Sequence, residues 1–284
     1  MPDAAEKLPK LGIIAGNGSL PIDIIKRCRE TGRAVFVLAV QDEADPAGLV
    51  GVDHVWFRMG AAAAAIRHLR ENGVREVVMA GGVRRPSLTS LRPDWRAAKM
   101  FARIGLRALG DDGLLTAVKR EFEAEGFKVV GAHSILGDRV AKSGLFGKVA
   151  PDAQAQADIA HGFRIVRALG DLDIGQAVVV QQGLVLGVEA IEGTDALLGR
   201  VGDLRRDGPG GVLIKAKKPN QDVEVDMPSI GPRTIELAHQ AGLRGVAVEA
   251  GGSLVLGLEL VVNKADRLGL FVIGVAPDSV VPTR

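Results

Sequence analysis

The sequence contains no tyrosine, a single cysteine and few aromatic side chains, which make up 4% of its 284 residues. The lone cysteine, Cys28, excludes a disulfide within the chain and is typical of a reducing compartment. The scarcity of aromatic rings argues against platforms on which nucleic-acid bases stack. The net charge of +2 gives no further reason to expect a nucleic-acid partner.

Long uncharged apolar runs are also missing. None approaches the roughly 20 residues that a membrane-spanning helix needs. The first ten residues carry Asp3, Glu6 and Lys7 where a signal peptide would have an apolar block, so we expect a cytoplasmic protein. Apolar residues make up 47% of the sequence and charged residues 25%, which indicates a globular chain of one large or two ordinary domains.

Residues 1–133 alternate between strand-like and helix-like segments joined by short loops that contain glycine. Such alternation is typical of a parallel sheet covered on both faces, so we predict a Rossmann-like N-terminal domain. The expected strands are residues 11–15, 34–39, 54–58, 76–80 and 127–130, and the expected helices are residues 21–31, 61–72, 95–109 and 114–125.

Residues 151–284 have a different pattern, in which adjacent strand-like segments are separated only by turn residues. This predicts hairpins and therefore a mixed α/β C-terminal domain, with residues 134–150 as a glycine-containing linker. The expected hairpins pair residues 177–181 with 184–189 and residues 211–217 with 222–227. The expected helices are residues 151–169, 195–204 and 232–241, and a last strand is expected at residues 270–275.

Two glycine-rich loops follow strands of the predicted N-terminal sheet and should meet beyond the carboxyl ends of these strands, where ligands of such sheets bind. In the first, Gly16, Asn17, Gly18 and Ser19 precede an amphipathic helix, whose N-terminal amides suit a phosphate group. Pro21 stands where the dinucleotide motif G-x-G-x-x-G has its third glycine, so an NAD-dependent oxidoreductase is only a rival interpretation. The second loop contains Gly81, Gly82 and Arg84. Arg84 either grips phosphate oxygens through its guanidinium fork or is simply solvated.

The strongest chemical signal is the alternation of Asp222, Glu224 and Asp226 with valines. In a strand these three carboxylates would share one face. Their mutual repulsion would then be relieved either by a divalent cation such as Mg²⁺ or by salt bridges to Lys215 and Lys217 across the hairpin.

A second acidic segment contains Glu192, Gly193, Thr194 and Asp195. Thr194 or Asp195 is expected to cap the following helix; in the alternative interpretation, Gly193 lets a ligand approach and the acidic side chains reach it. No nucleophile elbow and no Walker loop is present, so hydrolysis by this chain would more naturally use metal-activated water.

Taken together, several segments in order along the chain resemble the LpxI family of UDP-2,3-diacylglucosamine pyrophosphatases. The opening segment with Gly16, Asn17, Gly18 and Ser19 is one of them. The others are Ala80-Gly81-Gly82-Val83, Gly110-Asp111-Asp112, Glu189-Ala190-Ile191-Glu192-Gly193-Thr194-Asp195, Lys218-Pro219-Asn220-Gln221-Asp222 and Asp226-Met227-Pro228.

The resemblance implies two α/β domains with the substrate between them. It also implies Mg²⁺-dependent hydrolysis of the pyrophosphate bond to UMP and 2,3-diacylglucosamine 1-phosphate, a step of lipid A biosynthesis. Asp226, Asp222 and Glu224 are then the expected catalytic residues, with Asp222 and Asp226 as metal ligands. The expected substrate-binding residues are Gly16, Asn17, Gly18, Ser19, Gly81, Gly82, Arg84, Glu192, Gly193, Thr194 and Lys215.

The lipid substrate that the resemblance implies carries two acyl chains. We therefore expect at most loose, peripheral contact with the inner face of the inner membrane, and a homodimer is one oligomeric state that remains open. The alternative function is that of a non-catalytic nucleotide-sugar-binding or regulatory protein, which would keep the glycine loops without needing the acidic residues.

Overall fold

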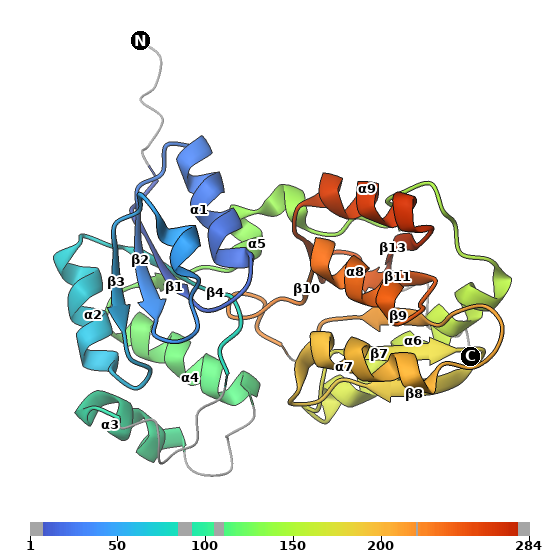
Figure 1. Ribbon diagram of the computed structural model, residues 1–284. Helices are drawn as coiled ribbons and strands as arrows, with labels where there is room; N and C mark the ends of the chain where they lie inside the picture. The colour runs from blue at the N-terminus through green and yellow to red at the C-terminus, as the bar shows by residue number, and fades with distance from the viewer. Residues whose placement is uncertain (1–7, 85–92, 105–110, 220, 278–284) are drawn as a thin grey trace. The chain divides into compact units, whose positions relative to one another are not determined.

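The structure is a computed structural model that describes residues 8–84, 93–104, 111–219 and 221–277. The chain divides into two compact units, both built from helices and strands (Figure 1). The first unit contains the chain up to Leu136 together with Asp222–Asp226. The second unit contains Gly137–Gln221 and the chain from Met227 onward. This two-unit α/β architecture confirms the predicted fold class.

The first unit is built around a five-stranded sheet in the order β3-β2-β1-β4-β5, in which every pair is parallel. From β1 the chain continues to β2 and β3 on one side, and then crosses to β4 and β5 on the other side. The carboxyl ends of β1 and β4 therefore form a switch point, which is where ligands of such sheets bind. The strands are β1 (Leu11–Ala15), β2 (Val35–Val40), β3 (His54–Phe57), β4 (Glu76–Ala80) and β5 (Lys128–Val129).

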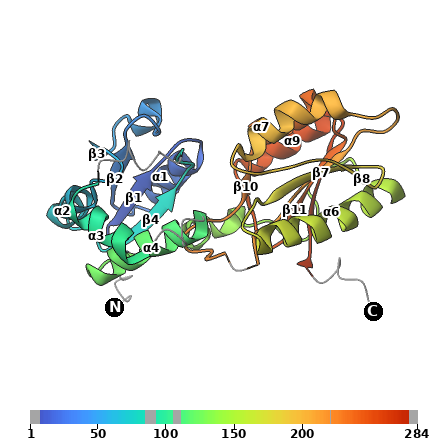
Figure 2. The same ribbon diagram turned by 90° about the horizontal axis from the view of Figure 1, so that it is seen from below.

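Helices lie on both faces of this sheet. The four expected segments form α1 to α4, although residues 105–109 of the expected third helix lie outside the described residues, and α5 and η1 were not expected. Phe36 and Leu38 of β2 pack in one cluster with residues of α2 and α4, and Figure 2 shows α1 and α4 on opposite sides of the strands. The helices are α1 (Leu20–Glu30), α2 (Ala62–Glu71), α3 (Trp95–Ile104), α4 (Asp111–Ala124) and α5 (Ala132–Ile135), with a short 3₁₀ helix, η1 (Pro46–Leu49).

The second unit contains a six-stranded mixed sheet in the order β6-β13-β11-β9-β7-β8. Its three central strands β13, β11 and β9 are parallel, whereas β6, β7 and β8 pair antiparallel with their neighbours. The strands are β6 (Gly144–Leu145), β7 (Ala177–Gln181), β8 (Leu184–Val188), β9 (Val212–Lys215), β11 (Gly245–Glu249) and β13 (Phe271–Val275); β10 (Ser229–Ile230) and β12 (Leu254–Val255) form a separate parallel pair.

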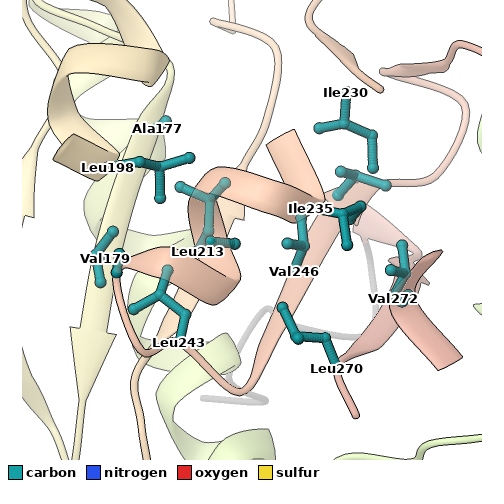
Figure 3. Packing of buried hydrophobic residues seen from close by; sticks show 14 of the residues in the cluster. Ala177, Val179, Leu198, Leu213, Ile230, Ile235, Leu243, Val246, Leu270 and Val272 are labelled. Atoms are coloured by element: carbon teal, nitrogen blue, oxygen red, sulfur yellow. The ribbon is translucent and has the colours of Figure 1, made fainter. Parts of the chain in front are cut away.

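Successive side chains of β7 point to opposite faces of this sheet and so enter two different cores. Val178 and Val180 pack with α6, while Val179 packs with the helices on the other face (Figures 2 and 3). Each fully buried side chain of this size contributes roughly 1.5–3 kcal/mol to folding. The helices are α6 (Ala153–Asp171), α7 (Gly193–Val201), α8 (Pro232–Gln240) and α9 (Leu258–Leu268), with 3₁₀ helices η3 (Gly137–Arg139) and η4 (Gly202–Leu204).

The predicted hairpin between residues 211–217 and 222–227 is wrong. Strand β9 is bonded on one edge to β7 and on the other to β11, so neither edge is free to accept a further strand. Residues 222–226 instead form a turn, in which the amides of Val225 and Asp226 donate to the Asp222 carbonyl at 2.9 and 3.2 Å. The acidic residues of the predicted catalytic hairpin therefore do not share a strand face.

The predicted linker also differs from what is observed. Residues 137–150 lie in the second unit, where β6 adds an antiparallel edge strand to β13. The glycines of this stretch therefore do not mark a structureless connection. Among the residues that the structure describes, no helix combines the length and the apolar character needed to cross a membrane.

Candidate active site

The glycine loops after β1 and β4 are in direct backbone contact. Asn17 and Gly82 form an isolated antiparallel bridge, in which the Asn17 amide donates to the Gly82 carbonyl at 2.7 Å and the Gly82 amide donates to the Asn17 carbonyl at 3.1 Å. The Gly16 amide adds a bond to the Ala80 carbonyl at 2.8 Å. The structure therefore brings together the two loops that the sequence predicts to meet at the switch point.

Glycine is required at two positions of this junction because the backbones approach so closely. A Cβ on Gly16 would lie 2.3 Å from the Gly82 carbonyl oxygen, and a Cβ on Gly81, whose φ is +86°, would lie 2.3 Å from the Asn17 carbonyl oxygen. By contrast, Gly18 has open space around it and is exposed, as is Ser19. The exposed part of the loop is thus free to face a ligand at the start of α1.

Glu43, which follows β2, ties these loops to a third one. Its carboxylate accepts hydrogen bonds from Asn17 Nδ2 at 3.1 Å and from Arg84 Nε and the Arg84 amide at 3.1 and 3.2 Å. The Glu43 side chain is 8% exposed, whereas Arg84 is 78% exposed. Arg84 Nη2 also donates to the Asp42 carbonyl at 3.1 Å, so the guanidinium is held on two of its nitrogens while the side chain stays mostly exposed.

The acidic turn is held by Lys119, in the middle of α4. The Lys119 ammonium donates to Asp222 Oδ2 at 2.7 Å and to Glu224 Oε2 at 2.5 Å. The other Asp222 oxygen, Oδ1, accepts the Glu224 amide at 3.1 Å. Two of the three predicted catalytic carboxylates thus share one cation, and the third, Asp226, belongs to the same turn.

The ionisation of this cluster follows from its contacts. Burial alone would raise the pKa of Asp222, but the hydrogen bonds from Lys119 and from the Glu224 amide outweigh it and hold that pKa below its usual value. The two carboxylates in turn raise the pKa of the Lys119 ammonium. Asp222 and Lys119 are therefore both charged at neutral pH.

In the second unit, Lys215 lies at the carboxyl end of β9 and belongs to a buried polar network. Its ammonium donates to Thr194 Oγ1 at 2.9 Å and to the Ser229 carbonyl at 3.2 Å. The Thr194 hydroxyl donates to Glu189 Oε1 at 2.6 Å, and Glu189 Oε2 accepts the Gln176 amide at 3.0 Å. Both Lys215 and Glu189 are buried. The hydrogen bonds of the Lys215 ammonium thus go to residues of its own unit.

The neighbouring Glu192 is engaged elsewhere. Its carboxylate pairs with Arg200 at 2.8 Å, which lowers the pKa of Glu192. Helix α7 begins at Gly193, whose φ of +80° favours glycine, so Thr194 and Asp195 lie inside the helix. The expectation that one of them caps the helix is thus wrong: Thr194 bonds to Glu189 and Asp195 pairs with Arg233 at 2.7 Å.

Within the described ranges, no three His, Cys, Asp or Glu side chains gather closely enough to hold a metal ion. This arrangement still fits Mg²⁺, which commonly binds through one or two carboxylates together with water and substrate phosphates. Asp222 and Asp226, both in the acidic turn, provide such a minimal carboxylate set.

Sequence reasoning missed three residues of these clusters. Glu43 could have been identified, because it follows β2, a parallel strand next to β1. Glu189 could also have been identified, because it lies in the segment Glu189–Asp195 that carries the family resemblance. Lys119 carries none, since a lysine in an amphipathic helix is ordinarily solvated. Of the segments that carry the family resemblance, Gly110, Asn220 and the side chains of Asp111 and Asp112 lie outside the described residues.

The fold and these clusters define a two-domain α/β protein. Its first domain is Rossmann-like, and the glycine loops after β1 and β4 meet there. Comparison with known families agrees: residues 10–139 match the LpxI N-terminal domain and residues 142–273 match the LpxI C-terminal domain. The chain belongs to the LpxI family.

One relative is the UDP-2,3-diacylglucosamine pyrophosphatase LpxI of Caulobacter vibrioides. It is 44% identical over 277 residues, covering 94% of this chain and 98% of the relative. Because the match spans almost the whole of both proteins, the two share the same domain composition.

Solved structures show only distant likeness. The UDP-glucose 4-epimerase of Thermus thermophilus, in complex with NAD, is 12% identical, with a TM-score of 0.30 over 94% of this chain and 86% of that one. The biotin carboxylase domain of a thermophilic 2-oxoglutarate carboxylase is also 12% identical, with a TM-score of 0.27 over 61% of this chain and 35% of that one. Likeness at this level supports no conclusion about function.

Proposed function

We propose that this protein hydrolyses the pyrophosphate bond of UDP-2,3-diacylglucosamine to UMP and 2,3-diacylglucosamine 1-phosphate, as a step of lipid A biosynthesis. The observation that carries the proposal is the match to both LpxI domains, with a relative of that named activity aligned over 98% of its length. The clusters described above supply the groups that such a reaction needs: a phosphate-type loop junction, an acidic turn and a buried lysine.

The loop junction of the first unit is the proposed site for the nucleotide and phosphate end of the substrate. Exposed backbone amides at the start of α1 favour negative charge, and the guanidinium of Arg84 suits phosphate oxygens. Gly18, which has open space around it, leaves room for close approach of the ligand. The residues proposed to bind here are Gly16, Asn17, Gly18, Ser19, Gly81, Gly82 and Arg84.

The acidic turn is the proposed source of the catalytic carboxylates. Asp226 is the residue that we propose accepts the proton of the attacking water, with Asp222 and Glu224 as its partners in the turn. Asp222 and Asp226 are also the proposed ligands of Mg²⁺. When bound, the ion would supply positive charge that offsets the two negative charges of the pyrophosphate.

The proposed bond cleavage takes place at the β-phosphorus, on the sugar side of the pyrophosphate. Water oxygen forms the new bond to this phosphorus while the bridging oxygen leaves with UMP, and the water proton passes to a carboxylate. Hydrolysis in ¹⁸O-labelled water tests the direction by mass spectrometry. We expect the label in 2,3-diacylglucosamine 1-phosphate; label in UMP would move the attack to the α-phosphorus.

In the second unit, we propose that Lys215 contributes positive charge to the phosphoryl oxygens. Its network with Thr194 and Glu189 supports this role, because two hydrogen bonds fix the ammonium at the carboxyl end of β9. Glu192, Gly193 and Thr194 complete the proposed substrate-binding set.

The decisive experiment incubates the purified protein with UDP-2,3-diacylglucosamine and measures UMP release with Mg²⁺ and with EDTA. We expect turnover that requires the divalent ion and that is lost in Asp226→Ala, while this variant still binds the lipid substrate. Binding without turnover by the wild-type protein would favour the alternative of a nucleotide-sugar-binding protein.

The two acyl chains of the substrate support loose, peripheral contact with the inner face of the inner membrane. Sedimentation with vesicles of anionic phospholipid tests this contact, since a protein that never sediments with them under any salt condition does not make it. Light scattering in solution tests the proposed homodimer.

A further inference from the structure

The acidic turn occupies an unusual place in the chain. Asp222–Asp226 belongs to the first unit, although the residues on both sides of it, up to Gln221 and from Met227, belong to the second. The rest of the first unit ends at Leu136, so this five-residue turn is the one later segment, among the residues that the structure describes, that belongs to it. The backbone hydrogen bonds within this segment are those of a single turn, so contacts with other residues of the first unit must hold it in place.

Lys119 provides the polar part of this attachment. The Lys119 side chain is 15% exposed, and its ammonium bonds to Asp222 and Glu224, which lie two residues apart and approach it from the same turn. Hydrogen bonds between oppositely charged groups are about twice as strong as neutral ones. Without the ammonium, the two carboxylates would repel each other and the turn would lose its ionic link to α4.

The backbone of the turn adds a second contact with the first unit. The Val223 carbonyl lies so close to Gly131, just before α5, that a Cβ on Gly131 would come within 2.8 Å of its oxygen. The turn is thus seated against the α5 end of the first unit as well as bonded to α4.

We propose that Lys119 is a positioning residue, which clamps the acidic turn to the first unit by binding Asp222 and Glu224 and so sets the place of Asp226. This inference rests on the proposed function for its catalytic consequence. In addition to the roles proposed above, Asp222 and Glu224 then hold the turn to which Asp226 belongs. Lys119 itself is not a catalytic residue, because it acts through the turn.

The first test is hydrogen exchange of the metal-free full-length protein in EDTA. In Lys119→Met, we expect the amides of Glu224 and Val225 to exchange about tenfold faster or more, the order expected from losing a charge-assisted hydrogen bond. Lys119→Arg keeps the charge and is expected to restore most of the protection. The matched control is Lys128→Met, which removes an exposed lysine of the same unit, whose partner Glu76 keeps its bond to Arg33.

The second test separates kcat from KM for UDP-2,3-diacylglucosamine. Lys119→Met is expected to lower kcat about tenfold, with KM changed by less than about twofold, and Lys119→Arg is expected to recover kcat. A lysine that only stabilises the fold would lower the melting temperature and leave kcat at 20 °C unchanged. Wild-type exchange at Glu224 and Val225 together with wild-type kcat in Lys119→Met would overturn the proposal.

Two further measurements keep the outcomes distinct. If Lys119→Met does not fold, Glu224→Gln removes one ionic partner from the side of the turn, and unchanged exchange at Val225 in that variant would contradict the clamp. If the wild-type protein releases no UMP, the proposed function fails, while the exchange comparison in EDTA still decides whether Lys119 holds the turn.

Discussion

The backbones of Asn17 and Gly82 bond to each other in both directions, at 2.7 and 3.1 Å. This bridge joins loops that are 65 positions apart in the sequence and fixes the spacing of the carboxyl ends of β1 and β4. Because the two chains approach so closely, a side chain cannot be added at the junction without moving one of the loops. The glycines at the junction therefore serve the packing of one loop against the other.

Gly16→Ala tests this packing requirement. The new Cβ would lie 2.3 Å from the Gly82 carbonyl oxygen, so one loop must shift. We expect destabilisation of roughly 1–3 kcal/mol, which thermal melting would register as about 2–4 °C for each kcal/mol. Gly137→Ala is the control, because a Cβ there has open space and its φ is not positive. Equal melting temperatures for both variants would contradict the close approach.

Glu43→Ala tests whether the carboxylate preorganises the loops. The change removes the carboxylate that accepts hydrogen bonds from Asn17 Nδ2 and Arg84 Nε. Each lost bond of this kind is worth about 0.5–1.5 kcal/mol, so we expect KM for UDP-2,3-diacylglucosamine to rise roughly two- to tenfold with little change in kcat. Glu71→Ala, on an exposed helix position of the same unit, should leave KM unchanged. An unaltered KM in Glu43→Ala would show that Arg84 does not need this support.

Thr194→Val tests the network around Lys215. Valine has the shape of threonine but lacks the hydroxyl, so the Lys215 ammonium and the Glu189 carboxylate each lose a bond while staying buried. An unsatisfied buried group costs about 1–3 kcal/mol, and we expect loss of stability in denaturant titration together with reduced kcat. Thr194→Ser keeps the hydroxyl and should lie close to the wild type. If valine and serine behave alike, the hydroxyl is dispensable.

The first sheet could be predicted from the sequence because its signals are local. The apolar run Leu11–Ala15 ends in glycines and is followed at once by an amphipathic helix, and the structure places β1 over the same residues. The same holds for β4 (Glu76–Ala80). Helix and strand periodicities, together with glycine at the loops, are enough to place such elements one by one.

The acidic segment could not be predicted because its structure depends on distant partners. The alternation of Asp222, Glu224 and Asp226 with valines is the pattern of a half-exposed strand. The segment could pair with β9 only if one edge of β9 were free. Both edges are occupied, by β7 and by β11, and the sequence interpretation did not identify β11. The bond from Lys119 to Asp222 spans 103 positions, and no local pattern reports it.

Glu249→Gln tests the buried carboxyl at the carboxyl end of β11. Burial raises the pKa of Glu249, and the Lys217 amide and charge offset this only in part. Below about pH 4, the carboxyl is neutral in both the folded and the unfolded chain, so it contributes no pH dependence. As the pH rises through the unfolded pKa, the unfolded chain ionises first, and stability falls until the folded pKa is passed.

The side-chain carbonyl of glutamine can still accept a hydrogen bond from the Lys217 amide, but glutamine carries no charge to bury. We therefore expect the melting temperature of Glu249→Gln to exceed that of the wild type by an increasing margin from pH 4 to pH 8, whereas Glu123→Gln, at an exposed position of α4, should follow the wild type throughout. A margin that shrinks as the pH rises would mean that the Glu249 carboxylate is stabilised in the folded protein instead.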